Sequence, residues 1–233
     1  MSLFTTRVAI PAMAVLLLAS ACTGPRVATQ GAERVEAGTT NIEGASPELE
    51  RLFWARHQES VARFVQADVD FMTGMIAHHA QALVMSRLAP TNSASPSVAT
   101  LCSRIINAQQ DEIATMQKWL RDRGQAVPEI HIEGLNLMVH GVGEHHHHMP
   151  GMLTQAQLEE LAAARGAEFD RLFLTYMIQH HTGALTMVNA LFAADGAAQD
   201  DATYKLAADI HADQVTEIAR MELMLSRTTG GSR

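Results

Sequence analysis

Two copies of the pattern Met-x-x-His-His hold the side chains in this sequence that are best suited to chemistry. On a helix, side chains three and four positions apart are neighbours, so each Met lies beside both of its histidines. A thioether sulfur combined with imidazole nitrogens suits soft ions such as copper(I) and silver(I). The pattern therefore predicts copper or silver binding, either at one site shared by the two copies or at a site in each. The predicted metal ligands are Met75, His78 and His79 in the first copy and Met177, His180 and His181 in the second.

The two histidines of a copy cannot have the same role. Neighbouring helix positions diverge by about 100° around the axis, so only one of the two can point straight into a core. His78 shares a helical stripe with Phe71, Met75 and Met85, which favours His78 and its counterpart His180 as the inward pair. Because Met85 lies about 10 Å further along the axis than His78, we expect it to pack in the core.

Two further groups of residues carry donor atoms. Glu112 and Glu217 could accept hydrogen bonds that orient the histidines, or they could be solvent-facing charges. A flexible His-rich tract binds divalent metals loosely by composition, but it could equally be a solvated linker. The additional metal ligands that we consider on this basis are His145, His146, His147, His148, Met149 and Met152.

The N-terminus has the features of an export signal. Arg7 precedes an apolar run over residues 8–18, which is too short to span a membrane. The run leads into Ala19-Ser-Ala-Cys22, which resembles a bacterial lipobox. We therefore expect residues 1–21 to be a signal peptide and Cys22 to carry lipid, with cleavage without lipidation as the alternative. Either outcome places the protein in the cell envelope, anchored to the outer face of a membrane or periplasmic.

Composition limits the remaining choices. Residues 22–47 are mainly Gly, Thr, Ala and Glu and form no core, so we expect a flexible tether. The formal net charge of -8 argues against nucleic acid as the main partner. If Cys22 is lipidated, Cys102 has no partner and is expected to be a small buried apolar residue.

Capping signals divide the chain into two similar halves. Ser46-Pro47 and Ser95-Pro96 each begin a helix, and Thr154 to Gln157 forms a capping box. We expect a first helical hairpin over residues 48–124, with motif helix 68–88 and a second helix from 96 to 124. A His/Met-rich connector without helical periodicity follows over residues 125–153. A second hairpin spans residues 154–227, with helices from about 168 to 194 and from 200 to 226.

The halves match in sequence, which predicts the architecture. An offset of 102 residues relates the two Met-x-x-His-His copies. An offset of 105 relates Gln109-x-x-Glu112 to Gln214-x-x-Glu217, so the second half has three extra residues. Two packed helical hairpins make an all-α four-helix bundle with pseudo-two-fold symmetry.

These motifs resemble domain of unknown function family 305. The resemblance covers about residues 48–225, and it rests on both Met-x-x-His-His copies, the Gln-x-x-Glu-Ile-x-x-Met elements and Met149-Pro-Gly-Met152. It implies a fold similar to ferritin-like bundles. The family includes the copper-binding CopM-like proteins of bacterial envelopes, which implies an exported protein that binds copper or silver in metal resistance or trafficking. The first copy departs from the pattern, because Ala80-Gln81-Ala82 lacks the Gly that Gly183 supplies in the second.

Two other functions compete with a metal-binding role. A structural or interaction lipoprotein would use its histidines only for hydrogen bonds within the core. A ferritin-like di-metal enzyme needs Glu-x-x-His on two helices, and the motif helices have none. A nucleophilic triad, a phosphate loop and a dinucleotide fingerprint are also missing from the sequence. We therefore predict that the protein is not an enzyme, that a copper ion or silver is its cofactor, and that its partners are metal ions and a membrane.

Overall fold

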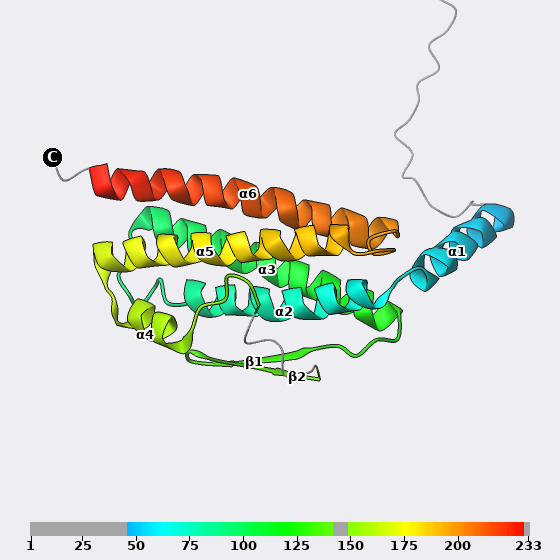
Figure 1. The fold of residues 1–233 in the computed structure, drawn as a ribbon, viewed down its shortest axis with the longest axis horizontal. Helices are drawn as coiled ribbons and strands as arrows, with labels where there is room; N and C mark the ends of the chain where they lie inside the picture. The colour runs from blue at the N-terminus through cyan, green and yellow to red at the C-terminus, as the bar shows by residue number, and fades with distance from the viewer. Residues whose placement is uncertain (1–45, 142–148, 231–233) are drawn as a thin grey trace, which may run out of the picture. The chain divides into compact units, whose positions relative to one another are not determined.

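A computed structural model describes residues 46–141 and 149–230 of the chain. The predicted signal peptide, most of the tether, Cys22 and His145–His148 lie outside these residues. Figure 1 shows long helices running side by side, with a two-stranded sheet along one edge. The predicted all-α class is confirmed. The helices are α1 Pro47–Ala62, α2 Gln66–Ser86, α3 Pro96–Asp122, α4 Gln155–Ala163, α5 Gly166–Ala193 and α6 Asp201–Gly230.

The helices begin where the capping residues predict. Ser95 Oγ accepts a hydrogen bond from Val98 N at the start of α3, and Pro96 is the first helical residue. Thr154 and Gln157 bond each other's backbone N–H at the start of α4. Helices α2 and α3 form one hairpin, α5 and α6 form another, and the two hairpins pack through α2 and α5. None of the described helices is both long enough and apolar enough for a membrane span.

The connector contains a β-hairpin that the sequence analysis did not predict. Strands β1 (Glu129–Glu133) and β2 (Asn136–His140) pair antiparallel, with Ile132 opposite Leu137. Gly134 turns the chain between them at a φ of +60°, which favours glycine. One face of the hairpin packs Ile130 and Ile132 against the bundle. The signal was the alternation of apolar and polar residues in Glu-Ile-His-Ile-Glu of β1, which is typical of half-buried strands.

The core consists of two apolar clusters separated along the bundle. One contains the start of α2 and the end of α5, and the other contains the end of α2 and the start of α5, as expected for antiparallel neighbours. Large members of the first cluster are Met72, Met75, Ile76, Met116 and Leu120. Large members of the second are Met85, Leu101, Ile105, Phe173 and Met177. Between the clusters every long helix carries polar residues, so a polar layer crosses the middle of the bundle.

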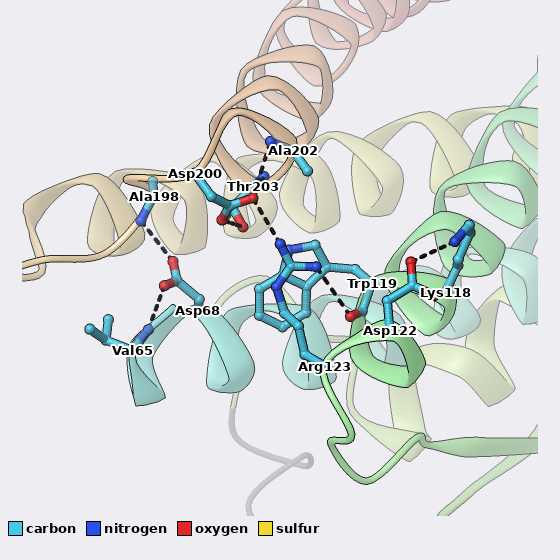
Figure 2. A network of polar contacts seen from close by, with 10 residues as sticks. All are labelled: Val65, Asp68, Lys118, Trp119, Asp122, Arg123, Ala198, Asp200, Ala202 and Thr203. Atoms are coloured by element: carbon cyan, nitrogen blue, oxygen red, sulfur yellow. Dashed lines mark hydrogen bonds and ion pairs between the residues drawn. The ribbon is translucent and has the colours of Figure 1, made fainter. Parts of the chain in front are cut away.

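Buried carboxylates tie each hairpin to the loop of the other. Asp68 at the start of α2 accepts hydrogen bonds from Val65 N at 2.9 Å and from Ala198 N, in the α5–α6 loop, at 2.7 Å (Figure 2). Asp170, at the equivalent position of α5, accepts from Ser95 N in the α2–α3 loop at 3.1 Å. These contacts fix the relative position of the two hairpins.

Candidate metal centre

The polar layer in the middle of the bundle draws its residues from all four long helices. Its members, which we call the central layer, are His78 and His79 of α2, Gln109 and Glu112 of α3, His180 and His181 of α5, and Gln214 and Glu217 of α6. All four histidines are 0% exposed. Burying polar groups costs free energy unless they find partners, so each imidazole nitrogen needs an explanation.

The inward pair lies at the contact between α2 and α5. The ring centroids of His78 and His180 are 3.8 Å apart, with 36° between the ring planes. His180 Nε2 lies 3.0 Å from the backbone oxygen of His78, and His78 Nε2 lies 3.0 Å from the backbone oxygen of Pro150. The structure thus places these two histidines face to face, as the helical stripe predicts.

The other pair faces the second helix of its own hairpin. His181 Nε2 donates to Glu217 Oε2 at 2.7 Å. His79 Nε2 also lies 2.7 Å from Glu112 Oε2, but the two groups are not aligned for a hydrogen bond. The His–Glu distance is therefore the same in the two halves, although the second half has three extra residues. Both carboxylates lie against histidines, and the solvent-facing alternative does not describe them.

The partners of the Nε2 atoms determine where the hydrogens of three imidazole rings are. For His78, His180 and His181, Nε2 faces an oxygen that can only accept, either a carbonyl or a carboxylate, so Nε2 carries the hydrogen. Nε2 of His79 makes no hydrogen bond among the described residues. A neutral ring then has a bare lone pair on Nδ1. All four Nδ1 atoms are buried, and within the described part of the chain none has a hydrogen-bond partner. The central layer thus contains four buried imidazole nitrogens without hydrogen-bond partners among the described residues, and imidazole nitrogen is a common metal ligand.

Burial also keeps the inward pair uncharged. Desolvation first, and then the neighbouring His79, lower the pKa of His78 to about 3. Desolvation and the other three histidines lower the pKa of His180 well below its ordinary value. Protons therefore do not compete with a metal ion for these two rings at neutral pH.

The predicted thioether ligands border the central layer on opposite sides. Met75 is fully buried in the first apolar cluster and Met177 is fully buried in the second. Each lies one helical turn before the histidines of its own copy. Among residues 46–141 and 149–230, no three His, Cys, Asp or Glu side chains converge as a ligand group. A donor set of few nitrogens completed by thioethers fits a soft ion better than a hard one.

A short segment of the connector, Met149–Leu153, which we call the strap, lies across the bundle next to the central layer. Gln81 holds one end, since its side chain accepts from Leu153 N at 2.7 Å and donates to Leu153 O at 3.0 Å. Gly183 lies under the other end, where a Cβ atom would come within 1.9 Å of Pro150 O. Gln81 and Gly183 are related by the 102-residue offset. Gln81, which stands in the first copy where the family pattern has Gly, thus forms the second contact that holds the strap.

The strap places further sulfur atoms near the site. Met149 Sδ would lie 3.3 Å from a Cβ atom at Gly74, and Met187 Cε would lie 3.4 Å from the same point. Gly74 is one turn before His78 on α2. Met152 instead lines a cavity of about 700 Å³ between α2 and the β-hairpin, together with Met138 and His140. Met149 is therefore near the motif copies, whereas Met152 faces a separate cavity.

Sequence reasoning missed one contributor to the site, the Pro150 carbonyl, which fixes the tautomer of His78 and whose role depends on the fold of the connector. The Met-Pro-Gly-Met motif was the available signal, since Gly151 at a φ of +78° allows the close approach to Gly183. Met187, the counterpart of Met85 in the second copy and likewise expected in the core, is partly buried beside the first cluster and lies near Met149.

Comparisons with known proteins identify the family and similar folds. The sequence model of DUF305, a domain of unknown function, matches residues 68–225. The crystal structure of a DUF305 fragment from Deinococcus radiodurans is similar, with a TM-score of 0.58 and 28% identity, over 70% of this chain and 98% of that one. No curated protein matches the sequence.

A copper-binding protein is also among the similar structures. CopM in its Cu(I)-bound form aligns with a TM-score of 0.51 and 26% identity, over 69% of this chain and 96% of CopM. The Cu(II)-bound form gives 0.53 and 27%, and the Ag-bound form 0.52 and 25%, with the same coverage. These ions are those bound by CopM.

Proposed function

Because the chain belongs to the DUF305 family, we propose that it is an exported, non-enzymatic protein that binds copper(I) or silver(I) in its central layer. The observation that carries this proposal is the set of four buried Nδ1 atoms without partners. A core that only hydrogen-bonded its histidines would satisfy these atoms as well, since a buried unpaired acceptor costs about 1–3 kcal/mol. A bound metal ion offsets that free-energy cost.

The proposed ligands are the residues that the Met-x-x-His-His pattern predicts. Nδ1 of His78 and His79 with the sulfur of Met75 forms one set, and His180, His181 and Met177 form the other. Glu112 and Glu217 orient the histidines without binding the ion, since a ligating imidazole usually donates its second N–H to a carboxylate or a carbonyl. Met149 of the strap is a further thioether donor.

The cellular role is proposed from the export signal and from the similar structures. The signal-like residues 1–21 and the lipobox-like Cys22 support an envelope location with a lipid anchor. CopM, similar in fold, is known in copper-bound and silver-bound forms. We therefore propose that the protein sequesters or carries soft metal ions at the cell envelope, in metal resistance or trafficking.

Competition titration of copper(I) against a coloured chelator tests the proposal. The purified protein without its signal peptide should take copper(I) from the chelator, and replacing His78 and His180 by Leu should weaken the affinity at least tenfold. Replacing His57 and His211, which lie outside the central layer, provides the matched control and should change nothing. Equal affinities for the two double variants would refute the assignment.

A further inference from the structure

Helix α1 carries an apolar face that no other described element covers. The helix has no extensive contact with another helix or strand, and its residues 47–59 are exposed. Leu49, Leu52 and Phe53 have the three-and-four spacing that places side chains on one helix face, and each is more than half exposed. Contiguous exposed apolar side chains mark interaction sites, whereas isolated ones are ordinary.

Aromatic rings extend this face along one side of α1. Trp54 is also more than half exposed, and its ring meets that of Phe53 edge-on, with the centroids 5.4 Å apart. The ring of His57 lies 5.8 Å from that of Trp54. At about 100° per residue, Arg51 and Gln58 lie on the opposite side of the helix. An aromatic, apolar side facing a polar side is typical of helices that lie in the headgroup zone of a membrane.

Further exposed apolar residues lie at the end of the bundle that α1 joins. Only residues 63–65 separate α1 from α2, and a Cβ atom at Gly196 of the α5–α6 loop would lie 3.5 Å from Val65 Cγ1. Phe192 and Tyr204 lie on either side of that loop, with their exposed rings 5.6 Å apart. Seven of the ten large apolar side chains that are exposed in the described chain lie on α1 or at this end, namely Leu49, Leu52, Phe53, Trp54, Val65, Phe192 and Tyr204. Exposed apolar surface is therefore concentrated where the chain enters the bundle.

The sequence before α1 indicates what covers this surface. The lipobox-like Cys22 precedes Pro47 by 25 positions, and a chain of that length reaches at most about 90 Å. A lipid on Cys22 would therefore keep α1 near the membrane surface, and docking would be intramolecular at an effective concentration of roughly millimolar. Resting on the lipid anchor of the proposed function, we propose that the apolar face of α1 lies in the headgroup zone of the membrane that holds the anchor.

Fluorescence of Trp54 on vesicles tests the docking. Trp119→Phe leaves Trp54 as the only Trp, since the sequence has two. The chain from Cys22 onward is attached through the Cys22 thiol to a maleimide lipid, in vesicles of phosphatidylethanolamine and phosphatidylglycerol. Burial raises the pKa of the Cys102 thiol to about 12, so Cys102 does not compete. Emission from Trp54 should move to shorter wavelength, and a quencher about 5–10 Å below the surface should act more strongly than one at the ends of the acyl chains.

Two paired variants identify the face that docks. Leu49→Ser with Phe53→Ser should abolish the wavelength shift and lower the quenching to that of the protein free in solution. Val215→Ser with Leu223→Ser is the matched control, since both residues are exposed apolar side chains of α6, and it should keep the shift and the quenching.

The other outcomes overturn the proposal. One is unchanged Trp54 emission on the vesicles, and another is equal loss in the two paired variants. A shift that appears without vesicles and grows with protein concentration would show that a second copy of the chain covers the face instead. Because the lipid is attached chemically, the result does not depend on lipidation in the cell. The mass of the exported protein measures that lipidation separately, so failure of the proposed anchor would be recognised independently.

Discussion

Four imidazole rings cross the middle of the bundle with no exposed surface, and their roles differ by one position along each helix. His78 and His180 face each other between the hairpins, whereas His79 and His181 face carboxylates within their hairpins. The donor residue types and the inward pair could be predicted from the sequence, because helical spacing fixes both. The tautomers could not, because they depend on the acceptors contributed by Pro150 and by the His78 backbone.

Burial of the inward histidines makes the metal-free protein sensitive to acid. Their pKa values are lowered in the folded state, and the ordinary value in the unfolded chain is about 6.5. The unfolded state therefore binds more protons below pH 6.5. Above that pH the two histidines make their full contribution to the free energy of unfolding. This contribution is lost as the pH drops towards the folded-state pKa of His78, which is about 3. Between pH 7.5 and 5.5 we expect a loss of about 3 kcal/mol from the two rings.

Urea unfolding at the two pH values, with metal removed by a chelator, measures this loss. The variant with Leu at positions 78 and 180 should show a clearly smaller difference between the two pH values, since it has no buried imidazole there to protonate on unfolding. The same pH dependence in the variant and in the parent protein would contradict the assignment of the acid sensitivity to these rings.

At the level of helices and loops, the docking of the strap determines how the site is covered. The amide of Gln81 holds Leu153, and Gly183 leaves room for the Pro150–Gly151 backbone. The sequence predicts the connector but not its docking, since the pairing of Gln81 with a backbone segment 72 residues away is a tertiary contact. The β-hairpin was missed for a different reason, because its strands are short and only half-buried.

Gly183→Ala should displace the strap. The added Cβ would meet backbone atoms, 1.9 Å from Pro150 O, and such overpacking costs typically about 1–3 kcal/mol. Movement of Pro150 also removes the acceptor of His78 Nε2–H, so copper(I) affinity should fall about tenfold or more. Thermal unfolding and chelator competition measure the two effects.

Gly74→Ala is the matched control on α2. Its Cβ would contact only the flexible ends of Met149 and Met187, at 3.3 and 3.4 Å, and alanine favours the helix by about 1 kcal/mol. Stability should therefore stay the same or rise. Equal losses for the two alanine variants would argue against a tightly docked strap.

At the scale of the whole molecule, the two hairpins are held in register at their ends as well as at the central layer. Asp68 and Asp170 reach from one hairpin to the loop of the other. Figure 2 shows how Asp200 adds to this at one end, by accepting from Arg123 Nη2 at 3.0 Å and from Thr203 N at 3.1 Å. The sequence predicts the four-helix bundle through its matching halves. It does not reveal these clamps, because each joins residues at least 75 positions apart.

Asp68→Ala should destabilise the fold by about 2–4 kcal/mol, because the buried Ala198 N–H loses its acceptor and the loop loses its anchor. Asp70→Ala, on the exposed side of the same helix turn, should stay within about 0.5 kcal/mol. Urea midpoints at an unchanged m value measure both. A loss of similar size at Asp70 would show that helix α2, and not the clamp between the hairpins, determines the effect.

In the proposed function, thioether sulfur and imidazole nitrogen together hold a soft ion inside the bundle. X-ray absorption of the copper(I)-loaded protein identifies the ligand atoms directly. We predict a shell of nitrogen together with sulfur, and a clearly smaller sulfur contribution when Met75 and Met177 are replaced by Leu. A shell of nitrogen and oxygen alone, or one unchanged by removing both methionines, would contradict the account.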